Sequence, residues 1–278
     1  MSGAAPAASL REPPWLDRPD ALERIAARAA AGELDAAEAE RLRHWTRHGY
    51  AVVPGLLAPE TARAVAADLD AFLAERAHLP RDELIFLLQN MYPHSAATRR
   101  VMRLPAALAW AERILGVPAL PYQSLHLPVS SQHGVHADEI LMTTRPRGYM
   151  LAVWYALEDI APDSGPLVLW PGSHRLPFVS ARSIGIPEDA SEAERGARFD
   201  ERYFPRMRAV AEASGLEPWR FVPRVGDALF WHSNVLHGAV APEREGATRR
   251  SLVVHYFGAG AEHYSDLYGR PCAIPELE

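Results

Sequence analysis

The chain has 278 residues, of which 48% are hydrophobic and 23% charged, values that are ordinary for a globular protein with one sizeable core. Its net charge of −6 disfavours a nucleic-acid-binding surface, and no apolar run approaches the roughly 20 residues needed to span a bilayer. All 29 basic residues are arginine, so an anion held by a basic side chain must be held by arginine.

The N-terminus and the cysteine count bear on location. Residues 1–14 lack a basic start followed by an apolar core, which disfavours a secretory signal. Cys272 is the single cysteine and cannot form an internal disulfide, which indicates a reducing setting. We therefore predict a cytoplasmic protein whose partner is a small-molecule substrate, with no nucleic acid and no membrane. Its oligomeric state stays open.

The first part of the chain predicts mainly helices. Residues 1–20 are rich in Ala, Pro and Ser, and we expect them to be disordered. Apolar residues at helical spacing, with turn residues at the ends, predict helices over residues 35–48, 59–76 and 105–115. Between the first two, residues 50–53 are predicted to form a short strand that Pro54-Gly55 closes.

From about residue 120 the pattern changes to short β-prone runs between turn residues. The predicted strands are residues 122–128, 134–138, 150–156, 167–170, 227–232, 236–240 and 251–257. Residues 178–223 interrupt this series, contain an amphipathic stretch at 202–213, and are expected to form a helical insertion. We predict an all-β core, a double-stranded β-helix (jelly roll, cupin-like) with N-terminal helices packed outside, as one domain over residues 21–278.

The pair His136 and Asp138, together with His237 far along the chain, gives the clearest chemical signal. Two imidazoles and one carboxylate form the facial triad that holds non-haem Fe(II) and leaves positions open for substrate and oxygen. The spacing of His136 and Asp138 places both side chains on one face at a strand end. We therefore predict that these three residues are the metal ligands and the catalytic residues.

Four other histidines compete with this assignment: His133, His174, His232 and His255. His133 could begin the triad, but its distance in sequence from Asp138 is poor for two ligands on one strand. We expect His232 to end the preceding strand as a core residue or as a partner of the ligands. His174 is expected to be a turn residue without a metal role.

Four short motifs occur in a fixed order. They are His136-Ala137-Asp138; Ser164-Gly165-Pro166-Leu167 with Pro171-Gly172-Ser173-His174-Arg175; Gly226-Asp227 leading to Leu236-His237-Gly238; and Thr248-Arg249-Arg250-Ser251. Together they resemble the phytanoyl-CoA dioxygenase family of Fe(II)/2-oxoglutarate-dependent oxygenases, over roughly residues 40–260. The segment that begins at Gly49 also resembles the start of that family's domain.

The resemblance implies the cofactors and their contacts. Fe(II) would be bound by the triad, with 2-oxoglutarate as cosubstrate and molecular oxygen as oxidant. Arg249 would bind the distal carboxylate of 2-oxoglutarate, with its neighbour Arg250 on the other face of a strand. Trp154 and Gln123 would contact the cosubstrate from neighbouring strands, although Trp154 could instead belong to the core.

The resemblance further implies a dioxygenase that hydroxylates a small molecule and releases succinate and carbon dioxide. Related halogenases carry Gly or Ala where this chain has Asp138, which favours hydroxylation. Desaturation, epoxidation or cyclisation on the same fold, and a non-catalytic cupin-like binding protein, stay open as alternatives. We expect residues 84–92, 139–148 and 178–223 to shape the substrate pocket; the substrate itself is not predicted.

Overall fold

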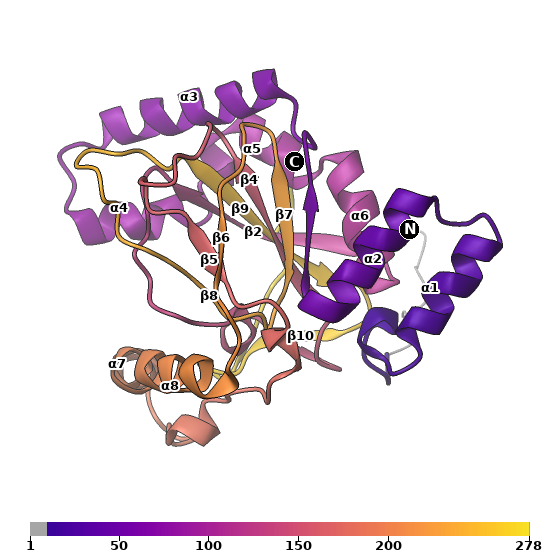
Figure 1. Cartoon of the computed structure of the whole chain (residues 1–278). Coiled ribbons are helices and arrows are strands. Elements are labelled where there is room, and N and C mark those ends of the chain that lie inside the picture. Colours follow the sequence, from indigo (N-terminus) through magenta and orange to yellow (C-terminus); the bar gives the residue numbers. More distant parts are fainter. Residues whose placement is uncertain (1–9, 278) are drawn as a thin grey trace, which may run out of the picture.

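A computed structural model of the protein describes residues 10–277, and residues 1–9 of the segment expected to be disordered lie outside that range. Six helices precede most of the strands (Figure 1): α1 (Ala21–Ala30), α2 (Ala36–His48), α3 (Pro59–Glu75), α4 (Arg81–Leu88), α5 (Ala96–Met102) and α6 (Pro105–Leu115). Two more, α7 (Glu192–Arg198) and α8 (Phe204–Ser214), flank a π-helix, Phe199–Tyr203. No helix among the described residues is long and apolar enough to cross a membrane.

The strands form three antiparallel sheets. The largest has the order β1-β7-β4-β9-β2, and its strands are β1 (Tyr50–Val53), β7 (Ala228–His232), β4 (Met150–Ala156), β9 (Ser251–Gly258) and β2 (Ala119–Leu127). A second sheet has the order β6-β5-β8, with β6 (Trp219–Phe221), β5 (Leu167–Leu169) and β8 (His237–Ala239). The third, β11-β10-β3, contains β11 (Arg270–Pro271), β10 (Glu262–Ser265) and β3 (Thr143–Arg145).

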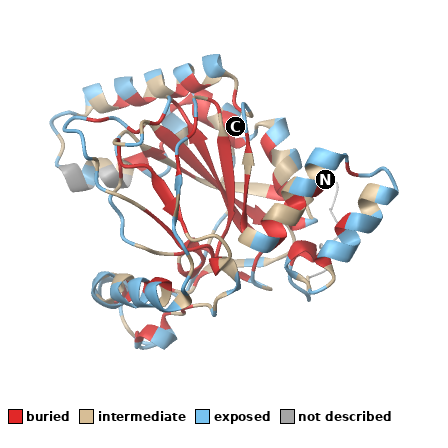
Figure 2. Ribbon diagram, viewed as in Figure 1, coloured by how far each residue is buried: buried red, intermediate tan, exposed pale blue. Residues whose placement is uncertain are grey.

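The three interior strands of the five-stranded sheet, β7, β4 and β9, are buried along their whole length and therefore on both faces (Figure 2). Alternate residues of a strand point to opposite faces. One set, which includes Val153, Phe230 and Val254, packs with apolar residues of the N-terminal helices. The other set, which includes Trp154 and Val253, packs with residues of β5 and β6. The two sheets therefore face each other, and the functional side chains described below lie on this inner face.

Local signals in the sequence explain where α2 begins and ends. The Asp35 side chain accepts a hydrogen bond from the Glu38 amide and the Glu38 side chain accepts one from the Asp35 amide, which forms a capping box. Gly49 ends the helix with φ +77°, a conformation that glycine adopts at little cost. A Cβ atom at Gly49 would lie 2.6 Å from His174 Nδ1, so the position also needs a residue without a side chain.

Several predicted elements coincide with the observed ones. The strands at residues 50–53 and 150–156 and the helix at 105–115 match β1, β4 and α6, and the helix predicted over 35–48 begins one residue later. The stretch predicted to be amphipathic at 202–213 overlaps α8. Helices α1, α4 and α5 and strands β3, β10 and β11 were not predicted.

Three segments differ from expectation. Residues 134–138 do not form a strand, because Asp138 already starts a 3₁₀ turn (Asp138–Ile140). The expected insertion at 178–223 is helical only in part, because β6 within it pairs with β5 in a sheet. Residues 10–20 are not disordered: Trp15 and Leu16 are buried, and Trp15 Nε1 donates a 2.9 Å hydrogen bond to the Arg113 carbonyl.

Candidate metal centre

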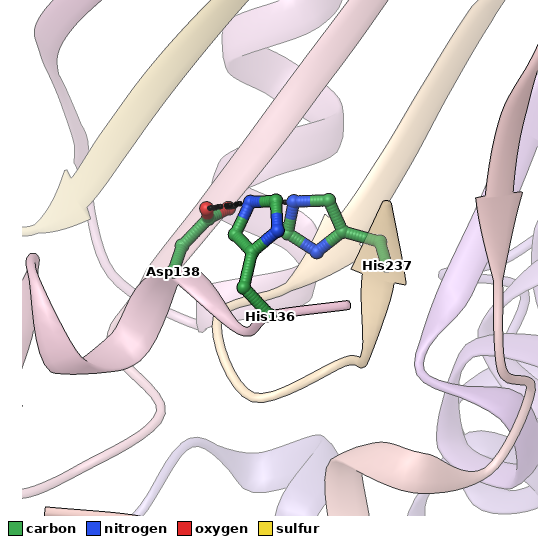
Figure 3. A group of neighbouring side chains, drawn as sticks. All are labelled: His136, Asp138 and His237. Atoms are coloured by element: carbon green, nitrogen blue, oxygen red, sulfur yellow. Dashed lines mark ion pairs between the residues drawn. The ribbon is translucent and has the colours of Figure 1, made fainter. Parts of the chain in front are cut away.

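His136, Asp138 and His237 point toward one another (Figure 3), His237 from β8 and the other two from the segment that leads into the 3₁₀ turn Asp138–Ile140. One ligand-type atom from each side chain lies within 4.8 Å of the others, and no second group of this kind occurs among the side chains that the structure describes. Asp138 Oδ1 is 3.9 Å from His136 Nε2 and 3.5 Å from His237 Nε2. The three side chains that the sequence singled out therefore converge on one point.

A reciprocal pair of backbone hydrogen bonds brings the two histidines together. The His136 amide donates to the His237 carbonyl at 2.9 Å, and the His237 amide donates to the His136 carbonyl at 2.8 Å. Gly238 allows this close approach, because a Cβ atom there would lie 3.1 Å from the His133 carbonyl oxygen and 3.3 Å from that of Gly134. Gly238 thus allows two segments that are far apart in the sequence to come into contact.

Each imidazole is oriented by a backbone carbonyl. His136 Nδ1 donates to the Gly134 carbonyl at 2.8 Å, and His237 Nδ1 donates to the Val235 carbonyl at 3.0 Å. A protonated Nδ1 leaves the lone pair on Nε2, the atom that faces the centre. Burial, together with the nearby His237, lowers the pKa of His136 to about 4, so this imidazole is neutral, as a metal ligand must be.

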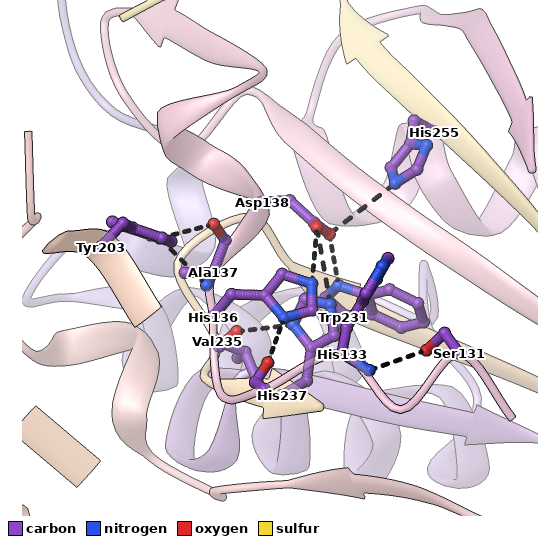
Figure 4. Close-up of polar contacts among 11 residues, drawn as sticks. Ser131, His133, His136, Ala137, Asp138, Tyr203, Trp231, Val235, His237 and His255 are labelled. Carbon is purple, nitrogen blue, oxygen red and sulfur yellow. Dashed lines mark hydrogen bonds and ion pairs between the residues drawn. The ribbon is translucent and has the colours of Figure 1, made fainter. Parts of the chain in front are cut away.

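The carboxylate of Asp138 is also held in place (Figure 4). Its Oδ2 accepts a 2.9 Å hydrogen bond from Trp231 Nε1 and lies 3.7 Å from His255 Nε2. Burial disfavours the charged form of Asp138, but the surrounding histidines outweigh this effect and hold its pKa below the usual range. The site therefore presents an ionised carboxylate together with the imidazoles of His136 and His237, whose Nε2 atoms face it.

The four competing histidines are not part of this group of three. His255 faces Asp138 from β9 as a neighbour of the carboxylate. His232 ends β7, as expected, and its Nε2 contacts Asp17 at 3.2 Å. The His133 ring lies 6.1 Å from the His136 ring, centroid to centroid, and His174 lies in a 3₁₀ turn. None of the four belongs to the group of three ligand-type side chains within the described part of the chain.

Arg249 is fully buried, with 0% of its surface exposed. None of its three guanidinium nitrogens has a hydrogen-bond partner among the described residues, and its Cζ lies 5.9 Å from the centre of the Trp154 ring. Burial lowers its pKa to about 10. Arg250 points the other way and pairs with Asp70 at 2.9 Å. A buried cation without a counter-charge is costly, so the site is suited to an anionic ligand.

Trp154 and Gln123 have different surroundings. Trp154 is buried between the sheets, packs edge-on against Phe221 with ring centres 5.6 Å apart, and has no hydrogen-bond partner for Nε1 among the described residues. Gln123 lies on β2 opposite His255 and lines a cavity that also contains His136. The tryptophan therefore adjoins Arg249, whereas the glutamine faces the open side of the centre.

This cavity has a volume of about 450 Å³ and opens beside His136. Of the segments expected to line a pocket, residues 84–92 contribute Gln89, residues 139–148 contribute Leu141 and Met142, and residues 178–223 contribute Phe199, Asp200 and Phe204. The C-terminal residues Ser265, Tyr268, Arg270, Pro271 and Cys272 also line it. That segment carries no motif, so the sequence offered no signal for it.

Comparisons with known proteins agree with this geometry. The sequence profile of the family described as phytanoyl-CoA dioxygenase (PhyH) matches residues 45–251. The chain is 26% identical to an ectoine dioxygenase of Nocardia farcinica over 222 residues, which cover 72% of this chain and 71% of that protein. It is 22% identical to the peroxisomal phytanoyl-CoA dioxygenase of Rattus norvegicus over 203 residues, 70% of this chain but only 56% of that protein.

Solved structures share the fold. The non-heme alpha-ketoglutarate-dependent carbocyclase SnoK from nogalamycin biosynthesis superposes with a TM-score of 0.61 at 19% identity, covering 89% of this chain and 96% of that one. EctD from S. alaskensis with bound Fe gives a TM-score of 0.61 at 16% identity, covering 87% of this chain and 85% of that one. At these identities the likeness establishes a common architecture of helices and antiparallel sheets.

Proposed function

The chain belongs to the phytanoyl-CoA dioxygenase family of iron- and 2-oxoglutarate-dependent oxygenases, and on this basis we propose that it hydroxylates a small organic molecule in the cavity beside His136. One observation carries the proposal. The structure contains a ligand set suited to Fe(II) and a buried arginine, without a partner among the described residues, that lies beside Trp154 and is suited to a carboxylate.

The metal ligands in this proposal are His136, Asp138 and His237. Their donor set, two imidazole nitrogens and one carboxylate oxygen, is that of the facial triad, which leaves further coordination positions open. The carbonyl contacts of both Nδ1 atoms keep each Nε2 available, and such outer contacts are usual for histidines that bind metals. The residues present therefore fit iron in the type and orientation of their donor atoms.

Arg249 is the proposed anchor of 2-oxoglutarate. A planar guanidinium can hold a carboxylate through two parallel hydrogen bonds, and none of the nitrogens of this one has a partner among the described residues. Trp154 would border the bound anion, because its ring lies beside the guanidinium and its Nε1 has no partner in the described part of the chain. Gln123 would contact the cosubstrate from the cavity side of β2.

The volume and the lining of the cavity limit the size and the polarity of the substrate. A volume of about 450 Å³ falls in the range of roughly 300–1,000 Å³ that is usual for sites of drug-sized ligands. Its walls combine aromatic rings, Tyr122, Phe199, Phe204 and Tyr268, with the polar groups of Gln89 and Asp200. These features support a small or medium-sized organic substrate that presents one apolar face.

When bound, iron and 2-oxoglutarate supply the activation of oxygen, with release of succinate and carbon dioxide and hydroxylation of the substrate. The residues of the chain hold the ligand atoms and exclude water: Asp138 and His237 are both buried. Trp231 keeps the carboxylate of Asp138 turned toward the imidazoles. The presence of a carboxylate at position 138, where related halogenases have none, supports hydroxylation.

Succinate formation tests the proposal. Purified protein with Fe(II), ascorbate and 2-oxoglutarate is expected to release succinate, at a rate that rises with an accepted substrate. Asp138→Ala is expected to abolish this release, whereas Asp163→Ala, at an exposed ion pair with Arg244, should leave it unchanged. Iron and 2-oxoglutarate binding are measured in parallel. A chain that binds neither would contradict the proposal, and one that binds both but turns over no candidate would favour the non-catalytic alternative.

The architecture and location complete the proposal. The facing sheets, whose inner residues form one apolar cluster, support a double-stranded β-helix. We take residues 21–278 as one domain, against which Trp15 and Leu16 of the preceding segment also pack, with a helical insertion that ends before β6. The single cysteine, Cys272, supports a reducing, cytoplasmic location.

A further inference from the structure

We propose that Tyr203 is a positioning residue of the metal centre, which acts by holding the backbone between His136 and Asp138. This inference rests on the metal assignment proposed above. Tyr203 belongs to the segment between β5 and β6, far from the ligand motifs in sequence, yet its side chain reaches the residue between two ligands (Figure 4).

The hydroxyl group of Tyr203 makes two hydrogen bonds to one residue. The Ala137 amide donates to Tyr203 Oη at 3.1 Å, and Tyr203 Oη donates to the Ala137 carbonyl at 2.8 Å. Both residues are buried, and no other described residue bonds to either backbone group of Ala137. One hydroxyl therefore satisfies a buried donor and a buried acceptor, neither of which water reaches easily.

These two bonds control the direction of both ligands. The Ala137 amide belongs to the peptide plane that follows His136, and the Ala137 carbonyl belongs to the plane that precedes Asp138. Holding both planes fixes the backbone on either side of Ala137, from which the two ligand side chains project. The segment needs such support, because it is not part of a strand and pairs with β8 only through His136.

The position of Tyr203 in the insertion is unusual. It is the last residue of the π-helix Phe199–Tyr203, a rare form that is frequent at functional sites. The ring of Tyr203 stacks on Phe199 with centroids 4.8 Å apart, and Phe204 lies edge-on to His136 at 6.1 Å. Phe199 and Phe204 line the cavity, so the same short segment forms a cavity wall and contacts the ligand segment.

The substitution Tyr203→Phe distinguishes the packing of the aromatic ring from the hydrogen bonds of the hydroxyl group. It keeps the aromatic ring, and with it the packing, but removes both hydrogen bonds to Ala137. Loss of a partner that orients metal ligands typically lowers metal affinity about 10–100-fold. We expect a weakening of at least about tenfold in the affinity of the metal-free chain for Mn(II) or Fe(II), measured by competition with a chelator.

Tyr256→Phe is the matched control. Tyr256 is buried on the opposite face of the five-stranded sheet, and its hydroxyl donates a 3.1 Å hydrogen bond to the Met102 carbonyl. Both variants lose a buried tyrosine hydroxyl and should have lower Tm values. Only Tyr203→Phe should lose metal affinity, because only its hydroxyl bonds to the ligand segment.

The possible outcomes distinguish the positioning role of Tyr203 from the proposed function of the protein. Unchanged metal affinity in Tyr203→Phe, or equal losses in both variants, would overturn the positioning role. A wild-type chain without metal affinity would overturn the proposed function, and this inference with it, before any variant is compared. If Tyr203→Phe does not fold, amide exchange of the metal-free wild type decides: slow exchange at Ala137 supports the contact, and exchange at the rate of an exposed amide overturns it.

Discussion

Trp231 Nε1 donates a 2.9 Å hydrogen bond to Oδ2 of Asp138, the carboxylate oxygen that lies away from His237 Nε2. Trp231 lies on β7, where it is opposite Tyr50 of β1 and Ala152 of β4, so an interior strand paired on both sides holds this donor. The ligand carboxylate is thus oriented by the core of the fold, and its other oxygen is directed at the two imidazoles.

Removing this donor should weaken the metal site. Trp231→Phe keeps a large aromatic ring but leaves Oδ2 of a buried carboxylate without its partner, and we expect metal affinity to fall about 10–100-fold. Chelator competition measures the change. Trp219→Phe is the control, because Trp219 is only partly buried and stacks on Tyr50 rather than contacting a ligand. Equal affinities in the Trp231 variant and the wild type would contradict this role.

Substitution of Arg249 should weaken the binding of 2-oxoglutarate without lowering the stability of the ligand-free protein. Arg249→Met removes the proposed anchor of 2-oxoglutarate, and the loss of a buried charge partner should weaken binding by about 2 kcal/mol or more, or about 30-fold. Without 2-oxoglutarate, the same change removes a buried charge that has no partner among the described residues, so stability should stay equal or rise.

Calorimetry with 2-oxoglutarate and urea unfolding of the ligand-free protein measure these two effects. Arg250→Met is the control, because Arg250 pairs with Asp70 at the surface and should leave cosubstrate affinity unchanged. A ligand-free Arg249→Met protein that is several kcal/mol less stable than the wild type would show that Arg249 has a structural partner instead.

Gly238 should be essential to the approach of the two histidines. In Gly238→Ala the new Cβ atom would lie 3.1 Å from the His133 carbonyl oxygen, and backbone atoms cannot easily move away. We expect a loss of about 1–3 kcal/mol of stability from overpacking, together with weaker metal binding. Gly196→Ala, in α7 with the nearest atom 4.0 Å away, should not reduce either quantity. Thermal unfolding with and without metal tests both statements.

The side chains gathered at the centre were predictable because their chemistry is specific. His136, Asp138 and His237 have side chains of metal-binding type, and His136 and Asp138 are two residues apart. The resemblance to the family, through its Thr-Arg-x-Ser motif, favoured Arg249 over Arg250, and Arg250 does point elsewhere, although both precede β9. Their roles in binding stay predictions. Tyr203 and Trp231 had no signature, since one bonds to backbone groups and the other to a side chain remote in sequence.

Those parts of the fold that have a distinctive local sequence pattern were also predictable. Strands such as β4 and β9 stand out because both faces are buried and the residues are apolar. The segment before Asp138 resembled a strand in its residues, yet only His136 pairs there, which no local pattern could indicate. The composition of residues 1–20 did not indicate that Trp15 packs in the core. Small residues dominate this segment, and two large apolar side chains, Trp15 and Leu16, hardly change the average.

His126 should make the protein less stable in acid. It is buried beside Thr98, whose Oγ1 is 2.9 Å from His126 Nε2, and burial lowers its pKa to about 4. The unfolded chain binds this proton near pH 6.5, so between pH 6.5 and 4 it holds more protons than the folded chain. The free energy of unfolding therefore falls as the pH falls through this window, by about 3 kcal/mol from this group.

Urea unfolding at pH 7 and at pH 4.5 measures this contribution. In His126→Gln the side-chain amide keeps a polar partner for Thr98 but does not titrate, so the variant should lose less stability than the wild type over the same interval. Other buried histidines, such as His174 with a pKa lowered to about 3 by burial, act in the same direction in both proteins and cancel in the difference. Identical pH dependences for the two proteins would mean that His126 is not buried in its neutral form.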